Sequence, residues 1–423
     1  MNLTLLIAGT LLLCIVVMVL TKDFLHPGFL FCIPWIVFLS LLPLSNYDYD
    51  GDSLCYFYFL AGTIVFECGC FIGLKKIRCK ERLTHQNVSA YYVNYSVLKL
   101  IILTEWIFTL YLMYSYFSLI RSHFTINIFM SYYLNQDKIN HTAFLGYGRN
   151  LFTSFGICMV IGYSRIVPEE QKRYKKYIFL QLIPYIVLTL TRMTRTGMLF
   201  ASLPLFMAFI VVTRQNNIQV FKKMTVAILA FLCIFGFVAV MKYHTLFSDG
   251  NFIRTILDQL ILYGSGAFVA FQKKFDSMNF MGFKGANTFR FFSAVLEKIT
   301  GTANTQPLIQ QFSSIGYHAT TNVYTFYQWY ADDFGPAFAL FAQFIAGTLH
   351  GFSYRKMSQT NLYGIYVYCL LIHPLIMQIF EDQYCSLMSS WIQFFIAGLL
   401  FLKTNLLFSR KANQKGIVLY LAK

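Results

Sequence analysis

Two arginines, Arg192 and Arg195, stand in a short polar run between two apolar stretches of the chain. Each guanidinium presents a rigid fork of N–H donors that matches two phosphate oxygens at once. The alternative is that both side chains only anchor helix ends by reaching lipid headgroups, which requires no ligand. Two cations in one tight turn favour an anion site, and a lipid-linked phosphate is the natural anion at a membrane surface.

Other charged residues that could take part in a reaction lie further along the chain. Arg254 is followed one helical turn later by Asp258, so an ordinary ion pair is an alternative to phosphate binding. Arg290 has the same two interpretations. His318 and Asp333 are the candidates for moving a proton, although a loop histidine, or a carboxylate just before a membrane span, is often structural.

The sequence offers no metal or nucleotide motif. No set of histidines and carboxylates has the ligand spacing of a metal site, and there is no Walker sequence, zinc motif or nucleophile elbow. The ten cysteines are scattered, mostly through apolar stretches, where packing explains them. We therefore expect chemistry without a metal or another cofactor.

Most of the charged candidate residues fall in one long segment, residues 243–333, that separates two groups of apolar spans. Loops longer than about 15 residues are usually functional or disordered, and the many Phe, Tyr and Ile residues here favour order. Apolar residues recur every three or four positions over residues 252–271, which predicts a helix lying in the membrane interface or re-entering the membrane. The alternative is a further spanning helix.

Composition places the chain in a membrane. It has 423 residues, of which 57% are hydrophobic and 12% charged, and its mean hydropathy is +0.55. A soluble domain carries roughly 25% charged residues. We expect an all-α polytopic protein with one transmembrane domain, residues 1–423, and about eleven spans, or twelve if residues 252–271 also cross. The predicted spans are 3–20, 28–44, 54–74, 97–119, 143–163, 177–190, 197–212, 224–241, 335–352, 362–380 and 387–402.

The charge pattern predicts an orientation. The formal charge of +16 comes from basic connectors between the spans rather than from one basic face, so we do not expect nucleic acid as a partner. Residues 75–82, 165–176, 214–223, 355–356 and the tail from residue 403 all fall on one side, which the positive-inside rule makes cytoplasmic. The N-terminus and residues 243–333 then lie on the outer side.

With this layout the chain resembles the bacterial O-antigen and related repeat-unit polymerases. The resemblance rests on many spans, on the Thr-Arg-rich outer turn from Arg192 to Gly197, and on one long outer loop. It also rests on the end of that loop, where Thr-Asn-Val-Tyr-Thr at 321–325 and Tyr-Ala-Asp-Asp-Phe-Gly at 330–335 precede another span. Many members have an even number of spans, whereas this chain has eleven predicted ones.

The resemblance implies roles for these residues. Loop arginines of that family hold the pyrophosphate of the substrate, which corresponds here by position to Arg192, Arg195, Arg254 and Arg290. We expect Arg195, Arg254, His318 and Asp333 to be catalytic, and Arg192, Arg290, Asn322 and Tyr324 to bind substrate.

The implied reaction is a metal-independent glycosyl transfer. A sugar chain on undecaprenyl pyrophosphate is the donor, and a second lipid-linked repeat unit offers the acceptor hydroxyl. The expected location is the bacterial inner membrane, with the active site facing the periplasm. Further partners implied are membrane lipid, a chain-length regulator protein and a flippase.

Two other functions fit the same layout. An O-antigen ligase, which hands the finished glycan to another lipid, differs only in its acceptor. A flippase or transporter for the lipid-linked sugar would need cations along a central path and often shows paired repeats, and no such repeat is visible in this sequence.

Overall fold

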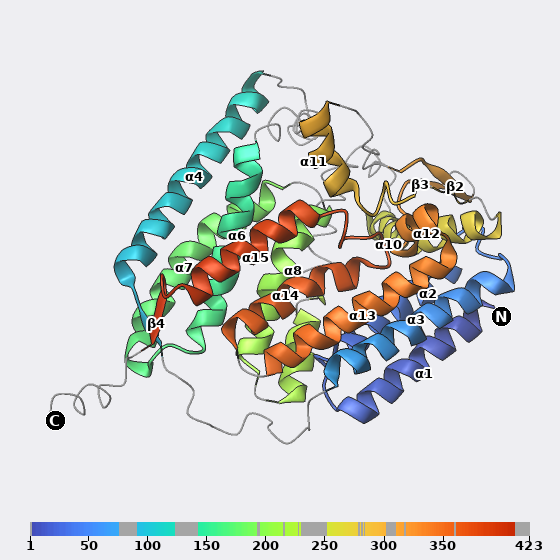
Figure 1. Ribbon diagram of the computed structural model, residues 1–423, viewed down its shortest axis with the longest axis horizontal. Coiled ribbons are helices and arrows are strands. Elements are labelled where there is room, and N and C mark those ends of the chain that lie inside the picture. The colour runs from blue at the N-terminus through green and yellow to red at the C-terminus, as the bar shows by residue number, and fades with distance from the viewer. Residues whose placement is uncertain are drawn as a thin grey trace. The chain divides into compact units, whose positions relative to one another are not determined.

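The computed structural model of the protein is helical (Figure 1). It describes residues 2–75, 91–122, 143–192, 195–214, 216–226, 228–229, 252–277, 280, 282, 284–301, 310–316, 319–358 and 361–410. Within these residues the chain forms fourteen helices and two small antiparallel sheets of two strands each. This confirms the all-α class expected from composition.

Five of the described helices are long and apolar enough to cross a membrane. They are α1 (Leu3–Thr21), α2 (Pro27–Leu41) with its extension η1 (Leu42–Leu44), α3 (Ser53–Leu74), α4 (Tyr95–Ser122) and α6 (Ala143–Tyr163). Three shorter apolar helices are α8 (Arg195–Val212), α14 (Leu362–Met377) and α15 (Met388–Lys403). Each coincides with a predicted span to within a few residues, and together they indicate a multi-pass membrane protein. Most of the span expected at 224–241 lies outside the described residues.

Helix α7 (Pro168–Leu190) corrects the prediction for residues 165–190. The expected span was 177–190, with 165–176 as a connector. The helix instead begins nine residues earlier and ends at Leu190. Pro168 suits the first helical position, and Glu169 and Glu170 in the first turn interact favourably with the helix dipole. The basic residues that follow are therefore part of the helix, although their charge had favoured a connector.

The chain forms two compact units, each assembled from three segments. The first contains Met1–Ile77, Gln215–Lys356 and Leu371–Ser389. The second contains Arg78–Arg214, Met357–Leu370 and Ser390–Lys423.

In the first unit, α3 and α13 (Pro336–Ser358) lie side by side (Figure 1). A Cβ atom added at Gly69 or Gly73 of α3 would clash with a backbone oxygen of α13. One added at Gly347 or Gly351 of α13 would clash with a backbone oxygen of α3. Both pairs follow the small-xxx-small spacing that lets membrane helices approach closely. This contact brings α13, which falls at the predicted span 335–352, against a helix that is long and apolar enough to cross a membrane.

The long segment after residue 243 is folded where it is described. Helix α10 (Phe252–Asp276) confirms the helix predicted at 252–271, and its second half is buried against α2 and α3. Ser265 Oγ donates to the carbonyl of Phe38 at 2.7 Å, and the ring of Phe268 lies 4.7 Å from that of Phe59. Next come α11 (Arg290–Thr300), the hairpin of β2 (Ser313–Gly316) and β3 (Ala319–Thr321), and α12 (Tyr327–Phe334).

The second unit is built from α4, α6, α7, α8 and α15. A buried apolar cluster joins α4, α6 and α7 through Phe108, Leu112, Tyr116, Leu145, Phe152 and Leu188. Strand β1 (Tyr91–Val93) pairs antiparallel with β4 (Phe408–Arg410). This pairing ties the start of α4 to the chain after α15.

Candidate functional site

Among the predicted arginines, Arg192 is the one whose contacts are described most fully. It lies in the turn between α7 and α8, and its Nη2 donates at 3.2 Å to Asn150 Oδ1 and at 3.2 Å to Thr153 Oγ1, both on α6. Its guanidinium carbon lies 5.6 Å from the centre of the Phe200 ring on α8. The side chain is thus directed into the helix bundle of the second unit.

A second arginine, Arg149 on α6, lies next to it. Arg149 is only 7% exposed, and its Nη2 donates to the hydroxyl of Tyr116 on α4. That hydroxyl in turn donates to the carbonyl of Thr191 at 2.9 Å. Tyr116 therefore holds both Arg149 and the turn that carries Arg192. We call Tyr116, Arg149, Asn150, Thr153 and Arg192 the arginine cluster.

The charges of the arginine cluster are unusual for a buried site. Burial, together with the nearby charge of Arg149, lowers the pKa of Arg192 to about 10, so the Arg192 guanidinium stays cationic at neutral pH. The hydrogen-bond acceptors of Arg192 are neutral oxygens, and among the described residues no carboxylate lies within ion-pair distance of it. Its buried Nε has no hydrogen-bond partner there either. Buried charge is costly without a counter-charge, so this geometry suits a bound anion.

The other predicted arginines are less fully described. Arg195 is the first residue of α8 and Arg254 lies in the first turn of α10, and both side chains are outside the described residues. Arg290 begins α11 and is half-buried, and burial lowers its pKa. Their roles stay predictions.

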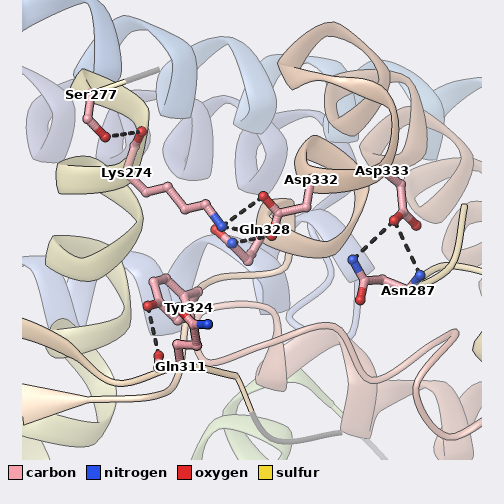
Figure 2. A network of polar contacts seen from close by, with 8 residues as sticks. All are labelled: Lys274, Ser277, Asn287, Gln311, Tyr324, Gln328, Asp332 and Asp333. Carbon is pink, nitrogen blue, oxygen red and sulfur yellow. Dashed lines mark hydrogen bonds and ion pairs between the residues drawn. The ribbon is translucent and has the colours of Figure 1, made fainter. Parts of the chain in front are cut away.

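The first unit holds a separate group of charged residues around α12, which Figure 2 shows. Lys274, near the end of α10, has its Nζ 2.7 Å from one oxygen of Asp332 and 2.8 Å from the other. The side chain of Asp332 is 1% exposed and that of Lys274 is 15% exposed. Gln328, one turn earlier on α12, also donates to Asp332. The pair is thus a shielded ion pair with an added hydrogen bond.

Asp333, predicted to be catalytic, has different partners (Figure 2). Its Oδ1 accepts from the backbone N–H of Asn287 at 3.2 Å and from Nδ2 of Asn287 at 3.1 Å. Its Oδ2 accepts from the N–H of Thr288 at 2.6 Å. Both oxygens therefore organise the turn that leads into α11. The catalytic role of Asp333 stays a prediction.

The remaining predicted residues lie in the chain just before α12. Tyr324 is buried, its hydroxyl donates to the carbonyl of Gln311 at 2.9 Å, and Lys274 Nζ lies 5.8 Å from the centre of its ring. Asn322 is half-buried. His318 lies outside the described residues. Tyr324 thus adjoins the Lys274–Asp332 pair, whereas substrate binding by Asn322 and Tyr324 stays a prediction.

A buried connector after α14 adds a proton-handling group that the sequence did not single out. Asp382 accepts from the Tyr330 hydroxyl of α12 at 3.0 Å and from the N–H groups of residues 384–386. Next to it, burial, together with the charge of Asp382, raises the pKa of Glu381 to about 7. Gln383 donates to Glu381 at 2.6 Å. A carboxyl with this pKa exchanges protons readily at neutral pH.

Arg149 and Glu381 were not among the residues predicted from the sequence, and only the first had a clear signal there. Arg149 and Asn150 interrupt the predicted span 143–163, and an ionisable residue inside a span is by default a functional candidate. Glu381 and Asp382 were visible only as a short acidic connector, and nothing in the sequence showed that this connector is buried.

No metal site is evident among the described residues, where no three His, Cys, Asp or Glu side chains are grouped closely enough to hold an ion. Metal-independent chemistry stays a prediction. Comparison of the chain with protein-family models, with curated proteins and with solved structures finds no match.

Proposed function

We propose that this protein is a glycosyltransferase that joins undecaprenyl-pyrophosphate-linked repeat units into a polysaccharide such as O-antigen or capsule. The observation that carries the proposal is the arginine cluster. The partly buried Arg192 has neutral hydrogen-bond acceptors and, among the described residues, no partner for its Nε, and the buried Arg149 lies beside it, so this position suits a bound anion.

The pyrophosphate of a lipid-linked sugar fits this requirement. It is the leaving group, and its negative charge grows as the bond between C1 and the pyrophosphate oxygen breaks. Fixed donors in a site shielded from water stabilise such a charge without reorganising, and losing one donor of this kind typically costs about 2.7–4 kcal/mol. In this mechanism Arg192 and Arg149 bind the leaving group and no metal is needed.

The acceptor hydroxyl must also lose its proton as its oxygen bonds to C1. A general base takes up this proton. The base holds the proton while the pyrophosphate departs as an anion.

A gene-deletion strain tests the function. Loss of a polymerase leaves glycans of a single repeat unit on the lipopolysaccharide, because a separate ligase still attaches them. Loss of a ligase or of a flippase removes all attached glycan. Single-repeat bands that lengthen when the wild-type gene is restored would support the proposal, and complete absence of bands would refute it.

The arginine cluster is tested in the same strain. Arg149→Ala and Arg192→Ala should fail to restore long chains at matched protein abundance. Lys172→Ala, which removes a positive charge from an exposed position of α7 in the same unit, should restore them fully.

A further inference from the structure

Helix α11 has an apolar side that the described chain leaves uncovered. None of its residues is buried, and Phe292, Leu296 and Ile299 are 54%, 58% and 75% exposed. At 100° per residue these three lie on one side of the helix, and Arg290 and Glu297 lie on the other. Such a helix needs an apolar surface to cover that side.

The uncovered side continues into a membrane-facing surface of the first unit. Phe289, just before α11, lies 6.3 Å from the ring of Phe334 at the end of α12. Phe334 lies 4.5 Å from Phe338 on α13, which lies 5.9 Å from Phe341. Phe341 begins a stripe of exposed apolar side chains on α13 that continues through Ile345, Leu349 and Phe352.

The packing of α13 indicates that this stripe contacts lipid. Its glycines pack backbone to backbone against α3, a long apolar helix, so α13 lies at the depth of the bilayer. Large apolar side chains exposed at that depth contact lipid. A surface that runs from them to α11 therefore meets the membrane where α13 begins.

The position of α11 is also held from within the protein. Asp333 binds the N–H groups of Asn287 and Thr288 just before the helix, and Gly285, with a φ of 92°, allows the chain to turn there. Together with the Asn287 side chain, three hydrogen bonds tie the start of α11 to α12, the helix that leads directly into α13.

We propose that α11 is a membrane-docking helix that lies on the bilayer surface beside α13, with Phe292, Leu296 and Ile299 among the lipid chains. Asp333 acts as the latch that sets its position. Arg290 and Lys298 lie at the height of the headgroups, where they attract anionic lipid. The occupant of this side is lipid rather than a protein partner, because the apolar surface is continuous with the lipid-facing stripe of α13.

The test uses the full-length protein in lipid nanodiscs of phosphatidylcholine and phosphatidylglycerol. An environment-sensitive fluorescent amino acid replaces either Leu296, on the apolar side, or Glu297, on the opposite side, and lipids with brominated acyl chains act as the quencher. We expect quenching several-fold stronger at position 296 than at 297. Equal quenching at both positions would overturn the proposal. So would a chromophore at 296 that is shielded in native membranes but unquenched in nanodiscs, because that result indicates a protein partner.

The latch is tested with Asp333→Asn in both labelled proteins. One oxygen becomes an amide that opposes an N–H donor of residue 287 or 288, so the tie should weaken. We expect the contrast between positions 296 and 297 to fall. An unchanged contrast would show that Asp333 does not position the helix.

Discussion

Replacing Arg192 is the most direct test of the anion site, because its environment allows the effect to be worked out. A phosphate oxygen about 4 Å from a guanidinium charge gains about 4 kcal/mol at an effective dielectric constant of about 20. A factor of ten in rate corresponds to about 1.36 kcal/mol. Arg192→Ala should therefore slow polymerisation by roughly a thousandfold.

Arg192→Lys separates charge from geometry. Lysine keeps the positive charge but has a single nitrogen, so it cannot bind Asn150 and Thr153 through one nitrogen while a second nitrogen donates to the ligand. A hydrogen bond to a charged group contributes about 1.5–3 kcal/mol, which predicts a rate roughly ten- to a hundredfold below wild type. A lysine variant with full activity would show that only charge matters at this position.

The assay is the initial rate of chain growth by purified protein in nanodiscs, supplied with lipid-linked repeat units and read as product length on a gel. Lys172→Ala is the matched control, since it removes an exposed charge from α7. Thermal unfolding of each variant shows whether the fold is kept. Wild-type rates for a stably folded Arg192→Ala protein would refute the argument that this side chain binds the pyrophosphate.

Further predictions concern helix packing, protonation, orientation and metal use. Gly73→Val should reduce the amount of folded protein, because its Cβ would clash with a backbone oxygen of α13, whereas Gly146→Ala, with nothing within 4 Å, should be neutral; equal yields would refute the close α3–α13 contact. Because burial and the nearby charge of Asp382 raise the pKa of Glu381 from 4.5 to about 7, this group favours folding most below pH 4.5 and loses that contribution as pH rises through 7. The free energy of unfolding should therefore fall over this range more in the wild type than in Glu381→Gln, and equal pH profiles would contradict the raised pKa. An impermeant thiol reagent should label a cysteine placed at Ser277 in intact cells but not one at Lys172; the reverse would overturn the orientation. Activity should persist in excess chelator, and loss restored by magnesium or manganese would contradict metal independence.

The sequence predicted the helices better than it predicted their contacts. Ten of the eleven expected spans coincide with helices in the described residues, because a run of apolar residues must be helical in lipid. It missed the start of α7, where charged residues continue a helix beyond its apolar part. It also missed the α3–α13 contact, since Gly73 and Gly351 are more than 270 residues apart and only the folded chain brings their backbones together.

Part of the candidate site could be predicted, because a charge between apolar stretches is visible in the sequence. Arg192 stood out because a charge in a short turn between apolar stretches has few structural explanations. Arg149 did not, because the apolar residues around it dominated the interpretation of its span. The carboxyl of Glu381 acquires its raised pKa from burial next to Asp382, and burial of a connector depends on the tertiary structure.

The pair Asp332–Asp333 shows why neighbouring identical residues take different roles here. Consecutive side chains on a helix point about 100° apart, so α12 directs Asp332 toward Lys274 of α10 and Asp333 toward the turn before α11. Tyr330 on the same short helix binds Asp382 in the connector after α14. The eight residues of α12 thus join three separate parts of the first unit. A substitution in α12 should therefore affect α10, α11 and the Glu381 connector together. A loss of activity in such a variant is assigned to catalysis only when each of these contacts has been measured and found unchanged.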